Sequence, residues 1–226
     1  MEELGQDYGF VLYEHKVTQA MSGLLQPGDR PRDRVIVYVN EARVGVIDSI
    51  CDTISLLVEN LGRVDYWSLE AYTFDGLTDP YKGIVGNVTI GSGKLKDWVM
   101  KSFPLAMAPS FSSSTSTLEV AATPFLYSGV FKAQNFSNPA ALDTFLEIPN
   151  GTKGMVWVNG FSLGRYWIIG PQQSLYLPGT ILKAGQNNDI VVLELEPEPN
   201  QPMFVRGETV RTWANNADPD YVLAAS

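Results

Sequence analysis

The sequence is poor in the residues that most metal sites and nucleophilic active sites require. It has one cysteine, Cys51, and one histidine, His15, in 226 residues. A single cysteine excludes an internal disulfide, and one cysteine with one histidine cannot complete a zinc or iron–sulfur site. Serine-based hydrolysis needs a histidine base and a nucleophile elbow. We expect no such elbow, and His15 lies in a predicted strand, where a structural role is favoured. We therefore expect no metal and no cofactor.

The sequence also lacks long apolar runs and an excess of positive charge. No run approaches the ~20 apolar residues that a membrane-spanning helix needs. The formal net charge is -9, which disfavours binding to nucleic acid and to anionic membranes. The acidic start, Met1-Glu2-Glu3, leads into no apolar segment of a signal peptide. We expect neither a nucleic-acid nor a membrane partner, and we interpret the chain as part of something longer.

No long segment repeats its apolar residues with a helical period of 3.6, whereas short alternating runs and turn residues occur throughout. The 20 glycines and 14 prolines suit a chain with many turns. The sequence therefore predicts an all-β fold.

One small piece of architecture occurs twice, at residues 37–45 and 156–164. In the second copy, Asn159-Gly160 supplies the positive φ angles of a two-residue type I′ turn. Alternation then predicts Val158 opposite Phe161 and Val156 opposite Leu163 on one face, with Trp157 and Ser162 on the other.

The first copy has the same pattern around a poorer turn, Asn40-Glu41, because glutamate disfavours positive φ. Here Tyr38 and Arg43 are predicted to point outward. A duplicated hairpin indicates two related β-sandwich domains.

We predict a first sandwich over residues 1–108, a Ser/Thr-rich linker over 109–118, a second sandwich over 119–212 and a tail over 213–226. Only eight residues separate Gly45 from Ile54, whereas 25 separate Gly164 from Ile190. The first sandwich is therefore expected to lack about one strand, which makes it incomplete.

Acidic and aromatic side chains are the remaining candidates for chemistry. Several carboxylates fall in predicted loops and strand ends, and we interpret them as solvated surface rather than as a glycosidase pair: Asp75, Asp79, Glu194, Glu196 and Glu198. Three tryptophans flank the hairpins and are candidates for stacking on sugar rings, although packing is the commoner use of such residues: Trp67, Trp157 and Trp167. Glycosylation sequons begin at Asn87, Asn135 and Asn150, which favours a secretory history.

Several ordered stretches resemble family 35 β-galactosidases of animals. They are Leu4–Tyr13, Leu57–Tyr66, Lys82–Thr89 and Lys153–Trp167, with Gly170-Pro171-Gln172 after them. The resemblance implies two galactose-binding-like, jelly-roll β-sandwich domains. In that family they follow a (β/α)8 barrel that carries the two catalytic glutamates, and this chain resembles only the sandwiches, so no catalytic residue is carried over.

The resemblance further implies a non-catalytic role, with the barrel, β-galactoside glycans and homo-oligomer contacts as partners and a lysosomal or extracellular location. Tyr66 matches a tyrosine that lines the galactose pocket, whereas Trp67 departs from the small residue usual there. Arg63 and Arg165 are expected to anchor loops through backbone carbonyls.

Two alternatives to this supporting role remain open. One is a free-standing galactose- or carbohydrate-binding module with Trp67, Trp157 or Trp167 as stacking platforms. The other is a product without activity whose apolar partner surface is exposed.

Overall fold

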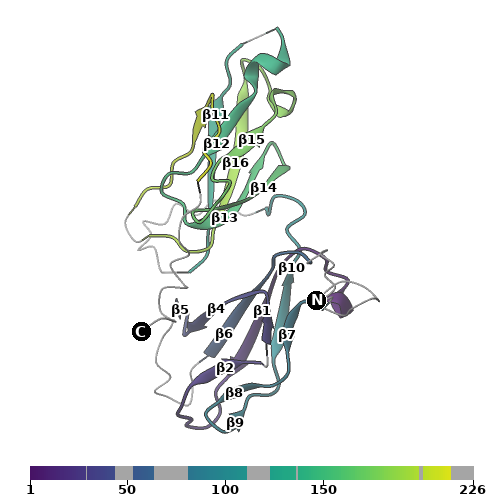
Figure 1. Ribbon diagram of the computed structural model, residues 1–226, viewed down its shortest axis with the longest axis vertical. Coiled ribbons are helices and arrows are strands. Elements are labelled where there is room, and N and C mark those ends of the chain that lie inside the picture. The colour runs from purple at the N-terminus through teal and green to yellow at the C-terminus, as the bar shows by residue number, and fades with distance from the viewer. Residues whose placement is uncertain are drawn as a thin grey trace, which may run out of the picture. The chain divides into compact units, whose positions relative to one another are not determined.

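The computed structural model describes residues 1–28, 30–43, 53–63, 81–110, 123–135, 137–198 and 201–214. The chain divides into two units, Met1–Ala106 and Met107–Ser226. The described residues form strands and three short 3-10 helices, η1 (Glu2–Leu4), η2 (Pro139–Leu142) and η3 (Gly179–Ile181) (Figure 1). The predicted all-β class is confirmed.

Unit 1 contains three sheets. The largest has the antiparallel order β10 (Val99–Phe103), β1 (Gly9–Lys16), β6 (Thr53–Asn60), β4 (Arg34–Val39), β5 (Ala42–Arg43). The second has the order β2 (Leu25–Pro27), β8 (Val88–Ile90), β9 (Gly93–Lys94), and the third pairs β3 (Arg30–Arg32) with β7 (Gly83–Val85).

The core of unit 1 lies between the largest sheet and β8. Alternate residues of β6, Ile54 and Leu56, are fully buried and pack in one cluster with Val88 and Ile90 of β8. Every second side chain of a strand points to the same face, so this spacing directs one face of β6 inward. Unit 1 is therefore a β-sandwich.

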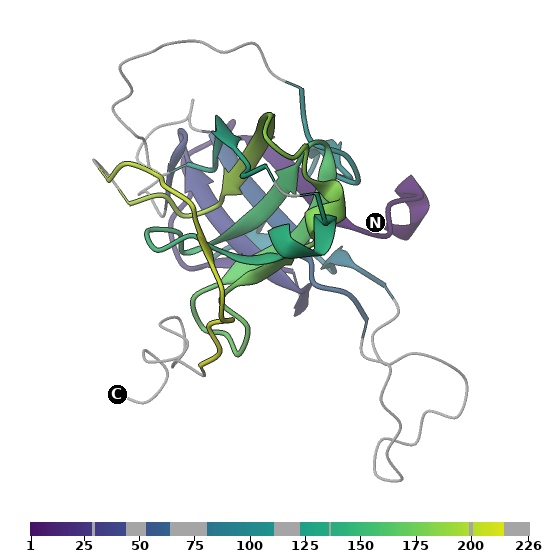
Figure 2. The ribbon, with the colours of Figure 1, turned by 90° about the horizontal axis from the view of Figure 1, so that it is seen from above.

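Unit 2 is built from two sheets. One has the order β11 (Phe125–Lys132), β16 (Asn187–Glu194), β13 (Lys153–Val158), β14 (Phe161–Trp167), and the other has the order β15 (Leu175–Leu177), β12 (Thr144–Glu147), β17 (Arg206–Glu208). Val156, Val158 and Val192 of the first sheet pack against Leu146 and Leu177 of the second. Unit 2 is a second β-sandwich, seen from above in Figure 2.

Both predicted hairpin turns are present. Asn159 and Gly160 have φ angles of 50° and 82°, and Asn40 and Glu41 have φ angles of 48° and 66°. Two consecutive positive φ angles are what a type I′ turn needs. The first turn therefore forms in spite of its glutamate.

The register of the second hairpin differs from the prediction after two pairs. Val158 pairs with Phe161 and Trp157 pairs with Ser162, but a β-bulge follows and Val156 pairs with Gly164 instead of Leu163. A bulge places one extra residue in one strand of the pair, and Gly164, at φ 101°, adopts the required backbone without strain. The predicted pairing of Val156 with Leu163 is therefore wrong.

In the first hairpin, Arg43 is exposed as predicted, but Tyr38 is not outward. Tyr38 is only 4% exposed and lies in the ladder between Ser55 and Arg43. A large, mainly apolar ring gains more from burial than the alternation pattern alone indicates.

Replacing Glu41 with glycine should stabilise unit 1 by about 0.5–1 kcal/mol, because glycine adopts positive φ without the penalty that an L-residue with a Cβ carries. The reverse change, Gly160→Glu, should destabilise unit 2 by a similar amount, since Gly160 has φ 82° and a Cβ added there would meet no neighbouring atom within 4 Å. Denaturant unfolding of both variants measures the two effects. Equal effects of the same sign would contradict the turn argument.

Some sequence predictions fall outside the described residues. The predicted gap in the first sandwich falls largely on residues 44–52, and the Ser/Thr-rich linker falls largely on residues 111–122. Tyr66, Trp67 and Cys51 also lie outside. The domain boundaries, the missing strand and these residues remain predictions.

Candidate functional site

A cleft of about 250 Å³ opens in unit 2 where β12, β14 and β17 come together. Trp167 at the end of β14 and Arg206 at the start of β17 contribute to its walls. The complete lining is Glu147, Ile148, Pro149, Gly151, Tyr166, Trp167, Ile168, Gln173, Arg206 and Thr212. Of the predicted sugar-stacking residues, Trp167 is therefore the one that the structure places in a cleft.

Trp167 is partly exposed, and one face of its indole ring is occupied from within unit 2. The Lys153 Nζ atom lies 3.6 Å from the ring centroid, and Lys153 is only 1% exposed. An ammonium group over a tryptophan face is a favourable cation–π arrangement, and more so when water is excluded. This contact fixes the plane of the ring at the rim of the cleft.

The wall that contains Glu147 is an ordered charge network. Arg206 donates from Nη2 and Nε to Glu147 Oε2, at 2.7 Å and 3.0 Å. The Thr212 hydroxyl donates to the other carboxylate oxygen, Oε1, and Arg206 also pairs with Glu208 at 3.0 Å. The Glu147 carboxylate is therefore held by a guanidinium on one oxygen and by a hydroxyl on the other.

Beneath the cleft lies a buried carboxylate, Glu194, at the end of β16 and 0% exposed. Its Oε2 accepts hydrogen bonds from the Tyr166 hydroxyl and the Thr152 amide, both at 2.8 Å. Its Oε1 accepts from the amides of Lys153 at 3.2 Å and Glu196 at 2.8 Å. Four donors thus satisfy one carboxylate that has no exposed surface.

The electrostatics of Glu194 contradict the prediction that this residue is solvated surface. Burial raises the pKa of the Glu194 carboxyl, although the four donated hydrogen bonds oppose the rise. Burial and the nearby carboxylate also raise the pKa of the Tyr166 phenol far above its ordinary value. Tyr166 lines the cleft, so the buried carboxylate supports the cleft from below.

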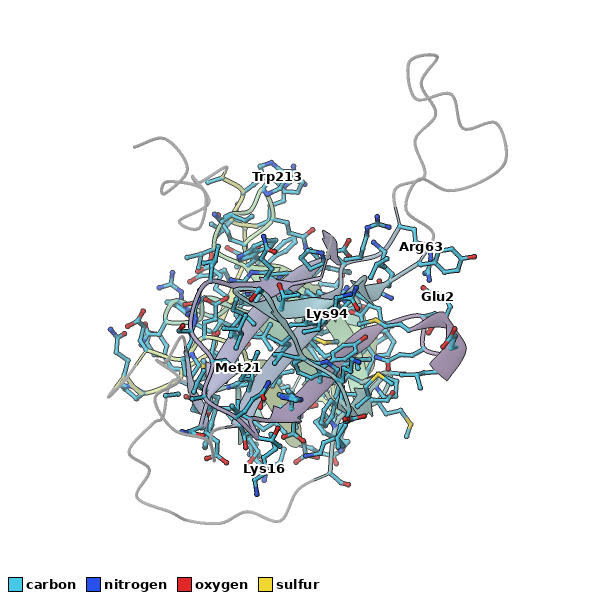
Figure 3. The ribbon with its side chains drawn as sticks, turned by 90° about the horizontal axis from the view of Figure 1, so that it is seen from below. Glu2, Lys16, Met21, Arg63, Lys94 and Trp213 are labelled. Carbon is cyan, nitrogen blue, oxygen red and sulfur yellow. The ribbon has the colours of Figure 1, made fainter. Side chains whose placement is uncertain are left out.

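Trp157 is not available as a stacking platform. It is 0% exposed, because it lies on β13, where all six residues are buried. A sugar can stack only on a ring face that reaches solvent, so the prediction for Trp157 is wrong and its ring is part of the protein interior. Trp213, which was predicted to lie in a tail, forms a β-bridge with Gln172 and is exposed (Figure 3).

The three sequon asparagines lie at different surface positions. Asn87 is exposed between β7 and β8, and Asn135 is exposed after β11. Asn150 is partly exposed, and its Nδ2 donates to the Pro202 carbonyl at 3.0 Å. Their glycosylation remains a prediction.

The residues Gly160-Phe161-Ser162-Leu163-Gly164 match the letters of a Gly-x-Ser-x-Gly nucleophile elbow, contrary to the expectation that the sequence holds none. That elbow requires a sharp strand-to-helix turn, whereas Ser162 lies within strand β14 of a hairpin. His15 is in β1 of unit 1, where its ring contacts the Lys96 carbonyl at 2.7 Å and the Trp98 ring at 5.2 Å. The structure gives Ser162 a strand position and His15 a structural role.

In unit 1, a cluster of charged groups holds Arg63 and Lys82, the described residues that flank segment 64–80. Glu2 forms an ion pair with Arg63, and its two oxygens accept from the Lys82 amide at 3.1 Å and 3.0 Å (Figure 3). The Lys82 Nζ donates to Asp33 at 2.6 Å, and Asp33 also accepts from the Leu61 amide at 2.7 Å. We call Glu2, Asp33, Arg63 and Lys82 the clamp.

The clamp draws together two points of the chain that are 19 positions apart in sequence. Burial alone would raise the pKa of Glu2, but the hydrogen bonds from the Lys82 backbone outweigh it and the pKa is lowered. Arg63 was predicted to bind backbone carbonyls, and its ion pair with Glu2 adds a charged partner that the prediction lacked. Tyr66 belongs to the segment that the clamp closes.

Large apolar side chains are exposed beside the clamp. Leu4, Leu61 and Tyr81 are all exposed, and each is within two positions of a clamp residue. Exposed apolar groups that gather around an ordered polar cluster are typical of a surface that meets another protein surface.

Neither a metal site nor a membrane-crossing helix is found in the described ranges. No group of three or more His, Cys, Asp or Glu side chains among them could hold a metal ion. In the same residues, no helix is long and apolar enough to cross a membrane.

Comparison with known proteins gives a consistent result for both units. Residues 1–106 match the family described as "Beta-galactosidase, first all-beta domain", and residues 124–187 match "Beta-galactosidase, galactose-binding domain". The chain is 36% identical to the β-galactosidase of Bos taurus over 230 residues, which cover 88% of this chain and 34% of that protein.

Two human proteins are similar to the same extent. β-Galactosidase of Homo sapiens is 36% identical, over 87% of this chain and 32% of that protein. Human "Beta-galactosidase-1-like protein 2" is 34% identical, over 86% of this chain and 31% of that protein. The chain therefore spans about a third of the length of these relatives. It belongs to the β-galactosidase family and carries that family's first all-beta domain and galactose-binding domain.

Proposed function

We propose that this chain is the non-catalytic β-sandwich part of a β-galactosidase. Its sandwiches support a (β/α)8 barrel that hydrolyses terminal β-galactosides, and Tyr66 lies at the rim of the substrate pocket. A barrel of this kind takes about 250 residues, whereas both domain families that match this chain are β-domains. This supports a role as scaffold.

The observation that carries the proposal is the clamp with its apolar surroundings. Glu2 binds Arg63 and the Lys82 amide, so one carboxylate fixes both flanks of the segment that contains Tyr66. A segment whose flanks are fixed loses less conformational freedom when it meets a partner, and this reduces the free-energy cost of positioning Tyr66.

The cleft of unit 2 does not resemble a glycosidase active site. Retaining hydrolysis needs one carboxylic acid that donates a proton and one carboxylate that attacks. Glu147 is held ionised by Arg206, and Glu194 is fully buried with both oxygens engaged. Neither group is arranged to transfer a proton to a sugar, which supports a non-catalytic role for this unit.

A lysosomal or extracellular location is part of the same proposal. Asn87 and Asn135 begin sequons and are exposed, as glycosylation in the secretory pathway requires. The net charge of -9 also suits an acidic compartment, where carboxylates are partly neutralised. Contacts between copies of the parent enzyme would add to the support of the barrel.

A chimera tests this proposal. Replacing the matching third of bovine β-galactosidase with this chain should preserve hydrolysis of a chromogenic β-galactoside, whereas the chain alone should show none. In the chimera, Tyr66→Phe should lower kcat/KM about tenfold, because one hydrogen bond to the bound sugar is lost.

Tyr81→Phe is the matched control, since Tyr81 is an exposed tyrosine beside the clamp. It should leave kcat/KM unchanged. Hydrolysis by the purified chain alone, or an equal loss of kcat/KM in both variants, would contradict the proposal.

A further inference from the structure

We propose that the cleft of unit 2 binds a single neutral pyranose ring, with Trp167 as its platform and Glu147 as its principal hydrogen-bond acceptor. The binding site belongs to unit 2 alone, and its occupation requires no barrel. The proposal selects one of the three tryptophans that the sequence left open.

The size and shape of the cleft favour one sugar ring. Its volume is about 250 Å³, which is below the roughly 300 Å³ at which pockets for drug-sized ligands begin. Trp167 offers a flat apolar surface at the rim, and the C–H groups on one face of a pyranose match such a surface. Because Lys153 occupies one face of the indole, a sugar stacks on the other.

The charges of the cleft select a neutral ligand. Arg206 is shared between two carboxylates, Glu147 and Glu208, so the network carries no positive excess to attract a phosphate or an acidic sugar. A wholly apolar ligand would leave this polar wall without water or partners, which is unfavourable. A polyhydroxylated neutral ring satisfies both conditions.

The hydrogen-bonding capacity of the wall also fits a sugar. A carboxylate has about four lone-pair sites, and Glu147 uses three of them for Arg206 Nε, Arg206 Nη2 and the Thr212 hydroxyl. One acceptor site is left for a sugar hydroxyl. Gln173 donates from Nε2 to the Ile168 carbonyl at 3.0 Å, which fixes the orientation of a second polar group on the lining.

The cleft is organised before any ligand binds. Glu194 holds the Tyr166 hydroxyl and the Thr152 amide beneath it, and Lys153 fixes the Trp167 ring. Side chains that are already ordered lose little entropy on binding. A small ring with few contacts can therefore bind at millimolar concentration.

The test is a titration of the whole chain with methyl β-galactopyranoside, followed by tryptophan fluorescence and by calorimetry. We expect saturation in the millimolar range. Trp167→Ala should weaken binding about tenfold or more, since it removes the stacking surface. Trp213→Ala, which changes an exposed tryptophan of the same unit that is not part of the cleft lining, should leave the Kd unchanged.

Trp167→Ala also removes the ring over a buried lysine, so a second variant guards against loss of folding. Gln173→Ala changes a partly exposed loop residue of the lining and should weaken binding severalfold with unchanged thermal unfolding. No saturation across the millimolar range, or equal weakening by Trp167→Ala and Trp213→Ala, overturns the inference. A chain that restores hydrolysis in the chimera but binds no sugar refutes this inference alone, and a chain that binds sugar but fails in the chimera refutes the proposed function alone.

Discussion

Replacing Gly154 with alanine should unfold unit 2. Gly154 lies in β13 between two neighbouring strands, opposite Tyr166 of β14 and Glu194 of β16. A Cβ at this position would lie 1.8 Å from the Leu193 carbonyl oxygen and 2.6 Å from the Tyr166 hydroxyl. The Leu193 carbonyl is backbone of β16, so the clash is relieved only if β13 and β16 separate.

Such a separation breaks the centre of the sheet, and we expect a loss of about 4 kcal/mol or more, a large part of the 5–15 kcal/mol that stabilises a typical domain. Denaturant unfolding measures it. Gly129→Ala is the matched control, since a Cβ there meets only the Ile190 Cγ2 at 3.5 Å, an ordinary contact in the same sheet. Similar unfolding midpoints for the two variants would contradict the argument.

The parts of the fold that depend on local signals were predictable from the sequence. Asn159-Gly160 encodes its turn directly, because these two residue types tolerate positive φ. Asn40-Glu41 was also identified, because the alternation on both sides of the turn outweighs one unfavourable residue. The bulge at Val156 was not predictable, since it changes no residue type in the pattern.

Burial in β13 depends on the whole sandwich and not on the pattern of one strand. Trp157 and Val156 are neighbours on opposite faces, and both are completely buried. Alternation predicts which residues share a face, but it does not say whether the second face is covered. The prediction of an exposed Trp157 failed for this reason.

The site has the same limitation. Trp167 was named from the sequence, but its cleft also needs Arg206 and Thr212, which lie about 40 positions further along the chain. Glu194 looked like one acidic residue in an acidic stretch, and its four donors come from three separate parts of the chain. Contacts between residues so far apart leave no signal in a single sequence.

Glu194 is the position of the second large effect. Glu194→Ala leaves four buried donors without their acceptor: the amides of Thr152, Lys153 and Glu196, and the Tyr166 hydroxyl. Each unsatisfied buried group costs about 1–3 kcal/mol, so we expect a total loss of about 3–5 kcal/mol after partial rearrangement. Glu198→Ala, at an exposed carboxylate nearby in sequence, should change the unfolding free energy by less than about 0.5 kcal/mol.

The same residue should make unit 2 more stable in acid than at neutral pH. Burial raises the pKa of Glu194 in the folded state, so the folded protein holds the proton more tightly than the unfolded chain. The resulting stabilisation is complete below the ordinary glutamate pKa and is lost as the pH rises through the folded value. The pKa values of Tyr127 and Tyr166, which are coupled to Glu194, are raised above the ordinary tyrosine range, so both phenols stay neutral in this window.

Glu194→Gln isolates this contribution, because glutamine keeps the shape of the side chain and one acceptor oxygen but does not titrate. The difference in unfolding free energy between the natural chain and this variant should change with pH, with the natural chain favoured most in acid. Other ionisable groups cancel in the difference because both proteins share them. A difference that stays constant from acid to neutral pH, or that favours the natural chain more as the pH rises, would show that the four donors outweigh burial and that Glu194 is ionised throughout.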